Sequence, residues 1–193
     1  MLVEDKILPK EINDLYEDLI KGSYQKLNED EKKIIKDSLV IAYNAHYGQL
    51  RKSGEPYINH PLGVAKIVGH NIGLDCDSIA AAILHDVVED TELTIKDINK
   101  AVGKNIGKIV DGLTKISILS KNKDHSVQAE NYRRMLLTLH NDIRVILIKI
   151  ADRLHNMRTI EFLDDIKKEK IASESLYIYA PLAHREGLFN VKN

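Results

Sequence analysis

Four ionisable residues follow the apolar stretch at residues 80–84 and are the first candidates for chemistry. His85, Asp86, Glu89 and Asp90 fall within six positions, and on a helix residues three or four apart share a face. Acidic groups at the C-terminal end of a helix oppose its dipole by about 0.3–1 kcal/mol each, so a plain solvated helix end explains them poorly. A metal cation would supply the missing positive charge, and we favour that interpretation.

A further carboxylate follows a helix that should be buried. In VILIKIADRLHNMRT, which ends at Thr159, apolar side chains cover nearly all sides of the first half, and Asp152 comes next. A carboxylate in that position is costly unless it binds a metal or is paired, and Arg153 is the alternative partner. Asn156 and Thr159 share a strip of the helix with Asp152. His155 points elsewhere and is interpreted as a structural residue.

The third candidate lies in RKSGEPYINHP, where a Gly-Glu-Pro turn leads to His60. Pro61 suits the first position of a helix, so we expect His60 at the N-cap, held by the backbone. Alone, His60 would more often satisfy a cap or the core, and Arg51 and Lys52 would form an ordinary solvated loop. Together with the other candidates, two imidazoles and two carboxylates without a thiolate suit Mn²⁺, Fe²⁺, Mg²⁺ or Zn²⁺.

The elements that must position these residues are predicted to be helices. Asn28 and Glu31 form a possible capping box, Asp77 and Thr94 are expected N-caps, and Gly73 and Gly103 are expected stops. No alternating strand pattern of any length occurs, so we expect an all-α single domain. The helices are expected over residues 28–50, 60–73, 77–90, 94–103, 105–119, 126–140, 142–159 and 167–187.

The composition excludes several classes of protein. The chain has 193 residues and a net charge of −1, which argues against a general nucleic-acid coat or a basic membrane-surface protein. The single cysteine, Cys76, excludes an internal disulfide and a cysteine zinc cage, and fits a reducing compartment. The first ten residues lack the pattern of a secretory signal, and no apolar run is long enough to span a bilayer. We therefore expect a cytoplasmic protein with no membrane or nucleic-acid partner.

The sequence around the candidate residues resembles the hydrolase (HD) domain of the RelA/SpoT homologue family, whose members make and destroy (p)ppGpp. The H…HD…D pattern alone is loose, but five longer stretches carry the likeness, which covers roughly residues 25 to 193. These stretches are RKSGEPYINHP, AAAILHDVVEDT, VDGLTKIS, DIRVILIKIADRLHNMRT and IYAPLAHREG.

The resemblance implies a single HD-domain helical bundle over residues 1–193, with residues 1–24 as a helical extension. It also implies that residues from about 175 to 193 begin the junction to a missing synthetase domain, so that the chain is an N-terminal fragment of a long bifunctional enzyme. The implied residues are the Mn²⁺ ligands His60, His85, Asp86 and Asp152, the catalytic acids Glu89 and Asp90, and the substrate-binding residues Arg51, Lys52, Ser53, Asn156 and Thr159.

The implied reaction removes the 3′-pyrophosphate of ppGpp or pppGpp, giving GDP or GTP and pyrophosphate, and so controls the stringent response. Lys115 is a further candidate for offsetting the charge of this guanine nucleotide. Two alternatives stay open: an HD phosphohydrolase of another nucleotide, and a regulatory domain that binds nucleotide without turnover. Intact Glu89 and Asp90 speak against the second alternative. The lysine-rich segment 117–128 is expected to be a surface loop rather than a flap over the phosphates.

Overall fold

The structure is a computed structural model that describes residues 8–121, 142–185 and 187–188. Within these residues there is no strand, and only one isolated antiparallel bridge joins Leu50 to Pro56. The all-α prediction is thereby confirmed. The helix expected over 126–140 lies outside the described residues, as does most of the loop expected over 117–128.

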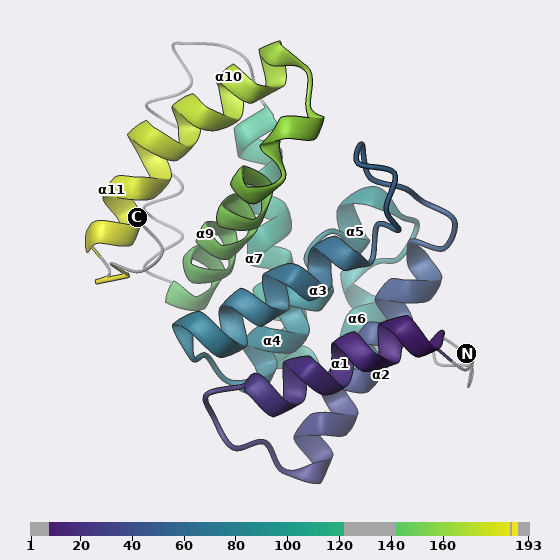
Figure 1. Cartoon of the computed structure of the whole chain (residues 1–193). Coiled ribbons are helices and arrows are strands. Elements are labelled where there is room, and N and C mark those ends of the chain that lie inside the picture. The colour runs from purple at the N-terminus through teal and green to yellow at the C-terminus, as the bar shows by residue number, and fades with distance from the viewer. Residues whose placement is uncertain (1–7, 122–141, 186, 189–193) are drawn as a thin grey trace.

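The helices follow one another with short connections, and the longest connection among the described residues precedes α3 (Figure 1). No helix in the described part of the chain combines the length and apolar character needed to cross a membrane. In chain order the elements are α1 (Lys10–Gly22), α2 (Glu29–Ala45), α3 (Asn59–Lys66), the π-helical η1 (Ile67–Ile72), α4 (Cys76–Ile83), α5 (Val87–Asp90), α6 (Ile95–Val102), α7 (Lys104–Lys121), α9 (Ile143–Arg158), the 3₁₀ turn η2 (Ile160–Phe162), α10 (Asp165–Glu174), the π-helical η3 (Ser175–Tyr179) and α11 (Ala180–Arg185).

Helix α4 forms the centre of the core, in contact with α2, α3 and α7. Its side chains from Ser78 to Ile83 are all buried, and the three consecutive alanines let neighbouring helices approach closely. Helix α9 packs against α3 and α7, and α10 to α11 flank it on the outer side (Figure 1). The helices that carry the candidate residues are therefore neighbours in space.

Several local signals act as the sequence predicts. Asn28 and Glu31 form a capping box at the start of α2, and Thr94 caps α6. Gly103 ends α6, and Gly73 ends η1 with a φ of 79°, a left-handed conformation that favours glycine. Each signal involves residues close in sequence, so it does not depend on the rest of the fold.

The prediction of a single helix over residues 77–90 is wrong. Helix α4 ends at Ile83, residues 84–86 form a turn, and α5 is one short further helix. The N-cap is Asp75 rather than Asp77, because the Asp75 carboxylate accepts a hydrogen bond from the Ser78 amide at 3.0 Å. His85 and Asp86 thus lie at a break between two helices.

The N-cap position expected for His60 is also wrong. Helix α3 begins at Asn59 and its N-cap is Ile58, so His60 is the second residue of the helix. The reason is that the preceding turn already has hydrogen-bonded geometry, with the His60 amide donating to the Tyr57 carbonyl at 2.9 Å. His60 nevertheless projects from a rigid element.

Candidate metal centre

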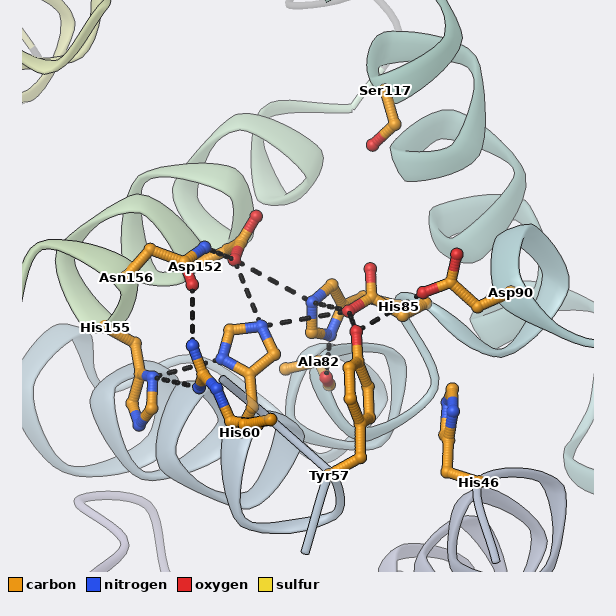
Figure 2. A network of polar contacts seen from close by, with 12 residues as sticks. His46, Tyr57, His60, Ala82, His85, Asp90, Ser117, Asp152, His155 and Asn156 are labelled. Carbon is orange, nitrogen blue, oxygen red and sulfur yellow. Dashed lines mark hydrogen bonds and ion pairs between the residues drawn. The ribbon is translucent and has the colours of Figure 1, made fainter. Parts of the chain in front are cut away.

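Three side chains from three separate elements converge on one point in the bundle. His60 comes from α3, His85 from the turn after α4, and Asp152 from α9, and all three are buried. Their ligand atoms all lie within 4.8 Å of one another. Figure 2 shows the three side chains pointing toward a common centre, with His60 Nε2 3.3 Å and His85 Nε2 3.9 Å from Asp152 Oδ1.

Asp86 lies next to this cluster, but it is not one of the three residues whose ligand atoms all lie within 4.8 Å of one another. Its Oδ2 lies 3.0 Å from His85 Nε2 and 3.7 Å from His60 Nε2. The same Oδ2 accepts a hydrogen bond of 2.6 Å from the Tyr57 hydroxyl. The role of Asp86 as a fourth ligand therefore stays a prediction.

His85 presents one ring nitrogen to the cluster. Its Nδ1 lies 2.8 Å from the Ala82 carbonyl oxygen, which can only accept, so Nδ1 carries a proton. Its Nε2 is buried and has no hydrogen-bond partner, since the contact with Asp86 lacks hydrogen-bond geometry. A buried, unpartnered imidazole nitrogen facing carboxylates fits a metal ligand whose other nitrogen fixes its orientation. The residues present therefore fit a divalent cation.

A buried lysine keeps Asp152 ionised. Burial would raise the pKa of Asp152, but the ammonium of Lys149 and the ring of His60 hold it well below its usual range. Lys149 Nζ lies 3.0 Å from Asp152 Oδ2 and donates to Ser117 Oγ at 2.9 Å. Oδ1 faces the two histidines and also accepts a hydrogen bond of 2.7 Å from Asn156 Nδ2. Arg153, the alternative partner, instead pairs with Glu174 at 2.7 Å.

The two cluster histidines differ in their electrostatic surroundings. Burial lowers the pKa of His60, and the neighbouring carboxylates only partly oppose this. Burial also acts to lower the pKa of His85, but Asp86 and Asp152 outweigh it and raise the pKa to about 9. Burial acts to raise the pKa of Asp86, but the contacts with His85 and His60 together lower it well below its usual value. Both carboxylates are thus ionised at neutral pH and attract a cation.

The cluster opens into a cavity of about 360 Å³, within the usual range for a small-molecule site. All five residues predicted to bind substrate line this cavity, together with three of the four predicted metal ligands. The lining residues are Leu50, Arg51, Lys52, Ser53, Tyr57, His60, Asp86, Asp152, Asn156, Thr159, Phe162 and Leu163.

Arg51 is held in place by backbone and side-chain hydrogen bonds. It lies in a tight loop, where its amide donates to the Glu55 carbonyl at 2.9 Å and its carbonyl accepts from the Gly54 amide at 2.9 Å. Its Nη2 donates to Asn156 Oδ1 at 3.1 Å and to Thr159 Oγ1 at 3.2 Å. The end of α9 therefore orients the guanidinium at the rim of the cavity.

The predicted catalytic acids lie on α5, beside the cluster, and do not line the cavity. Glu89 is half-buried, whereas Asp90 is exposed. Asp90 Oδ2 lies 3.3 Å from the Tyr57 hydroxyl, which also bonds Asp86. Lys115 is exposed, pairs with Asp111 at 2.5 Å and is not among the cavity-lining residues.

Sequence reasoning missed three side chains of this network. Tyr57 stacks on His46, with ring centroids 4.5 Å apart, and directs its hydroxyl at Asp86. Lys149 could have been found as a charge within an apolar run, one turn before Asp152. His155, interpreted as structural, contacts both His60 and Arg51. No local signal in the sequence indicates that contact.

The chain matches the HD domain family over residues 38–189. It is 45% identical over 178 residues to the bifunctional (p)ppGpp synthase/hydrolase SpoT of Escherichia coli K12, covering 92% of this chain and 25% of that protein. It is 48% identical over 162 residues to a GTP pyrophosphokinase of Myxococcus xanthus, covering 82% of this chain and 21% of that protein. The chain thus spans about a quarter of the length of these curated relatives.

A similar fold occurs in a solved structure described as "A metazoan ortholog of SpoT hydrolyzes ppGpp and plays a role in starvation responses". The superposition has a TM-score of 0.59 at 25% sequence identity, and it covers 81% of this chain and 97% of that one. The likeness therefore extends over nearly all of a smaller protein.

Proposed function

Because this chain belongs to the HD domain family, we propose that it hydrolyses the 3′-pyrophosphate of ppGpp or pppGpp, releasing pyrophosphate and leaving GDP or GTP. Relatives from Escherichia coli O157:H7 and Haemophilus influenzae, at 45% and 48% identity, carry the name guanosine-3′,5′-bis(diphosphate) 3′-pyrophosphohydrolase. The observation that carries the proposal is the cavity in which a cluster of potential metal ligands meets basic and polar side chains.

The proposed cofactor is Mn²⁺, held by His60, His85, Asp86 and Asp152. When bound, such a cation acidifies water and offsets phosphate charge. The donor set of two imidazoles and two carboxylates supports a divalent ion of intermediate softness, and the lack of a thiolate favours Mn²⁺ over the ions that prefer sulfur. The ammonium of Lys149 offsets part of the negative charge of the carboxylates.

The nucleotide is proposed to lie along the cavity wall formed by the loop before α3 and the end of α9. Arg51 and Lys52 would offset the charges of the phosphates, and the flat guanidinium of Arg51 could stack on the base. Ser53, Asn156 and Thr159 supply hydroxyl and amide groups for directional hydrogen bonds. Asn156 and Thr159 already hold Arg51, so we expect them to exchange that contact for the ligand.

Glu89 and Asp90 are the proposed proton-handling groups. They would orient or deprotonate the attacking water and assist the leaving group. Asp90 lies 3.3 Å from the Tyr57 hydroxyl, which bonds Asp86 at 2.6 Å, so it stands at the edge of the proposed cation site. Glu89 is half-buried on the same short helix.

The chain is proposed to work within a longer protein. The Escherichia coli K12 relative is named a bifunctional synthase/hydrolase, and the aligned part is 25% of its length. We propose a synthetase domain in cis as partner, residues 1–24 as an extension of the hydrolase domain, and residues from about 175 onward as the junction. The role in the stringent response and the cytoplasmic location stay predictions.

The test is ppGpp turnover by the purified chain, first stripped with chelator and then given Mn²⁺, with the products separated by anion exchange. GDP and pyrophosphate should appear only after Mn²⁺ is restored. Binding of ppGpp without product would favour a regulatory nucleotide-binding domain. Faster turnover of a different 3′-phosphorylated nucleotide would favour another HD phosphohydrolase. Parallel assays with Mg²⁺, Zn²⁺ and Fe²⁺ test the choice of ion.

A further inference from the structure

His155 contacts His60, a residue of the proposed metal centre, but is not among the residues that line the cavity. Its Nδ1 lies 3.0 Å from Nδ1 of His60, and the two rings meet at an interplanar angle of 62°. The same Nδ1 lies 3.3 Å from Nη1 of Arg51. One nitrogen atom of His155 thus faces both a candidate metal ligand and a candidate substrate-binding residue.

These two contacts determine where the protons lie. A guanidinium can only donate hydrogen bonds, so Nδ1 of His155 must be an acceptor, with the ring proton on Nε2. His60 must therefore donate its own Nδ1 proton to His155, because two unprotonated nitrogens 3.0 Å apart would repel. The lone pair of His60 would then reside on Nε2, beside Asp152 and Asp86, where a cation between the three side chains would offset the repulsion.

The position of the His155 ring is itself constrained by α3. Gly63 lies one turn after His60 on that helix, and a Cβ at Gly63 would overlap Nε2 and Cδ2 of the His155 ring. The ring therefore packs against bare backbone. Helix α3 therefore supplies His60 itself and, at Gly63, the space that the His155 ring occupies.

We propose that His155 is a positioning residue, which orients His60 and fixes its tautomer so that Nε2 is available to a divalent cation. The inference rests on the proposed cation site. A partner on the outer nitrogen of a ligating histidine typically contributes about 10- to 100-fold to metal affinity. In most such sites the partner is a carboxylate or a carbonyl; here a neutral imidazole takes that place.

The experiment is calorimetric titration of Mn²⁺ into the chelator-stripped chain, for the wild type and four variants. His155→Leu removes the acceptor and should weaken Mn²⁺ binding about 10- to 100-fold. His155→Asn places an amide oxygen near the position of Nδ1 and should bind Mn²⁺ more tightly than His155→Leu, recovering most of the lost affinity. His184→Leu, at an exposed site on α11, is the matched control and should bind as wild type does.

Gly63→Ala tests the same contact without altering either histidine. The added Cβ should push the His155 ring away from His60 and weaken Mn²⁺ binding, although alanine favours the helix more than glycine does. Thermal unfolding in chelator separates affinity from folding, because His155→Leu and His155→Asn should unfold at similar temperatures.

The outcomes distinguish this inference from the proposed function. Wild type that binds no Mn²⁺ would overturn the cation site, and the inference with it. Wild type that binds while His155→Leu binds equally well would overturn the inference alone. Equal losses in His155→Leu and His155→Asn would also overturn it, because a merely space-filling role would not be rescued by an acceptor.

Discussion

The ammonium of Lys149 lies 3.0 Å from Asp152 Oδ2, and the two side chains are only 11% and 12% exposed. Burial alone would lower the pKa of Lys149, yet Asp152 and Asp86 raise it, so the lysine stays charged. Lys149 is therefore the permanent counter-charge to the candidate metal centre on the side away from the cavity.

Lys149→Met should destabilise the cation-free chain by about 3–5 kcal/mol, because it leaves the Asp152 carboxylate buried without its partner. Added Mn²⁺ should restore part of this loss by supplying positive charge on the other side of Asp152. Urea unfolding in chelator and in Mn²⁺ measures both effects. Lys168→Met, at an exposed pair with Asp165, is the control and should change little. An identical loss with and without Mn²⁺ would contradict the argument.

Asp86→Asn should abolish Mn²⁺ binding and turnover together. The substitution keeps the size of the side chain but removes a negative charge 3.0 Å from His85 Nε2. Calorimetric titration and the ppGpp assay measure the two losses, with the exposed Asp165→Asn as control. If Asp86→Asn bound Mn²⁺ with wild-type affinity, three residues would suffice and Asp86 would not be a ligand.

Glu89→Gln should keep Mn²⁺ affinity and lower kcat about 100- to 10,000-fold, because it removes a proton-handling group and leaves the ligands intact. Glu92, three positions further along, is exposed, so Glu92→Gln is a matched control. Steady-state kinetics at saturating Mn²⁺ measure the effect. A near-normal kcat in Glu89→Gln would remove Glu89 from the chemical step.

Arg51→Ala should mainly raise KM for ppGpp, by about 10- to 100-fold, because it removes charge-assisted hydrogen bonds to the nucleotide. Arg51→Lys should recover little of this, since lysine offers neither the planar fork nor a stacking face. Arg158→Ala, exposed at the end of α9, is the control. Unchanged selectivity against the adenine analogue in Arg51→Ala would place the guanidinium away from the base.

Arg144 joins the starts of the two helices that carry the site, and this link should depend on pH. It contacts Asp142, the N-cap of α9, at 2.8 Å and Asp75, the N-cap of α4, at 3.1 Å. The Arg144 side chain donates hydrogen bonds that hold the pKa of Asp142 below its usual value. The unfolded chain therefore binds more protons at acid pH, so this stabilisation is present above the usual Asp pKa near 4 and is lost as pH falls through the lowered pKa.

Arg144→Met should accordingly destabilise the chain by about 1 kcal/mol at pH 7, the contacts being partly exposed. The difference from wild type should shrink as the pH falls below about 4. Urea unfolding of both chains between pH 7 and pH 3 measures it. A difference that stayed constant over that range would mean that Arg144 acts through packing of its aliphatic stem.

Much of the helical structure could be predicted because its signals are local. The capping box at Asn28, the cap at Thr94 and the stop at Gly73 each depend on residues a few positions apart. The break after Ile83 could not be predicted in the same way. The stretch around it has a helical pattern, and the packing of α4 and the short helix α5 against α7 is a property of the whole bundle.

The sequence by itself determined the kinds of donor available and the helices that carry them, since residue types and short spacings are written in the chain. Only the tertiary structure decided which donors meet. His60 and Asp152 are 92 positions apart, yet the packing of α3 on α9 brings Nε2 and Oδ1 to 3.3 Å. Lys149 and Asp152 lie one turn apart on α9, so their pairing follows from helix geometry alone. The contact between His60 and His155, by contrast, exists only because α3 packs on α9.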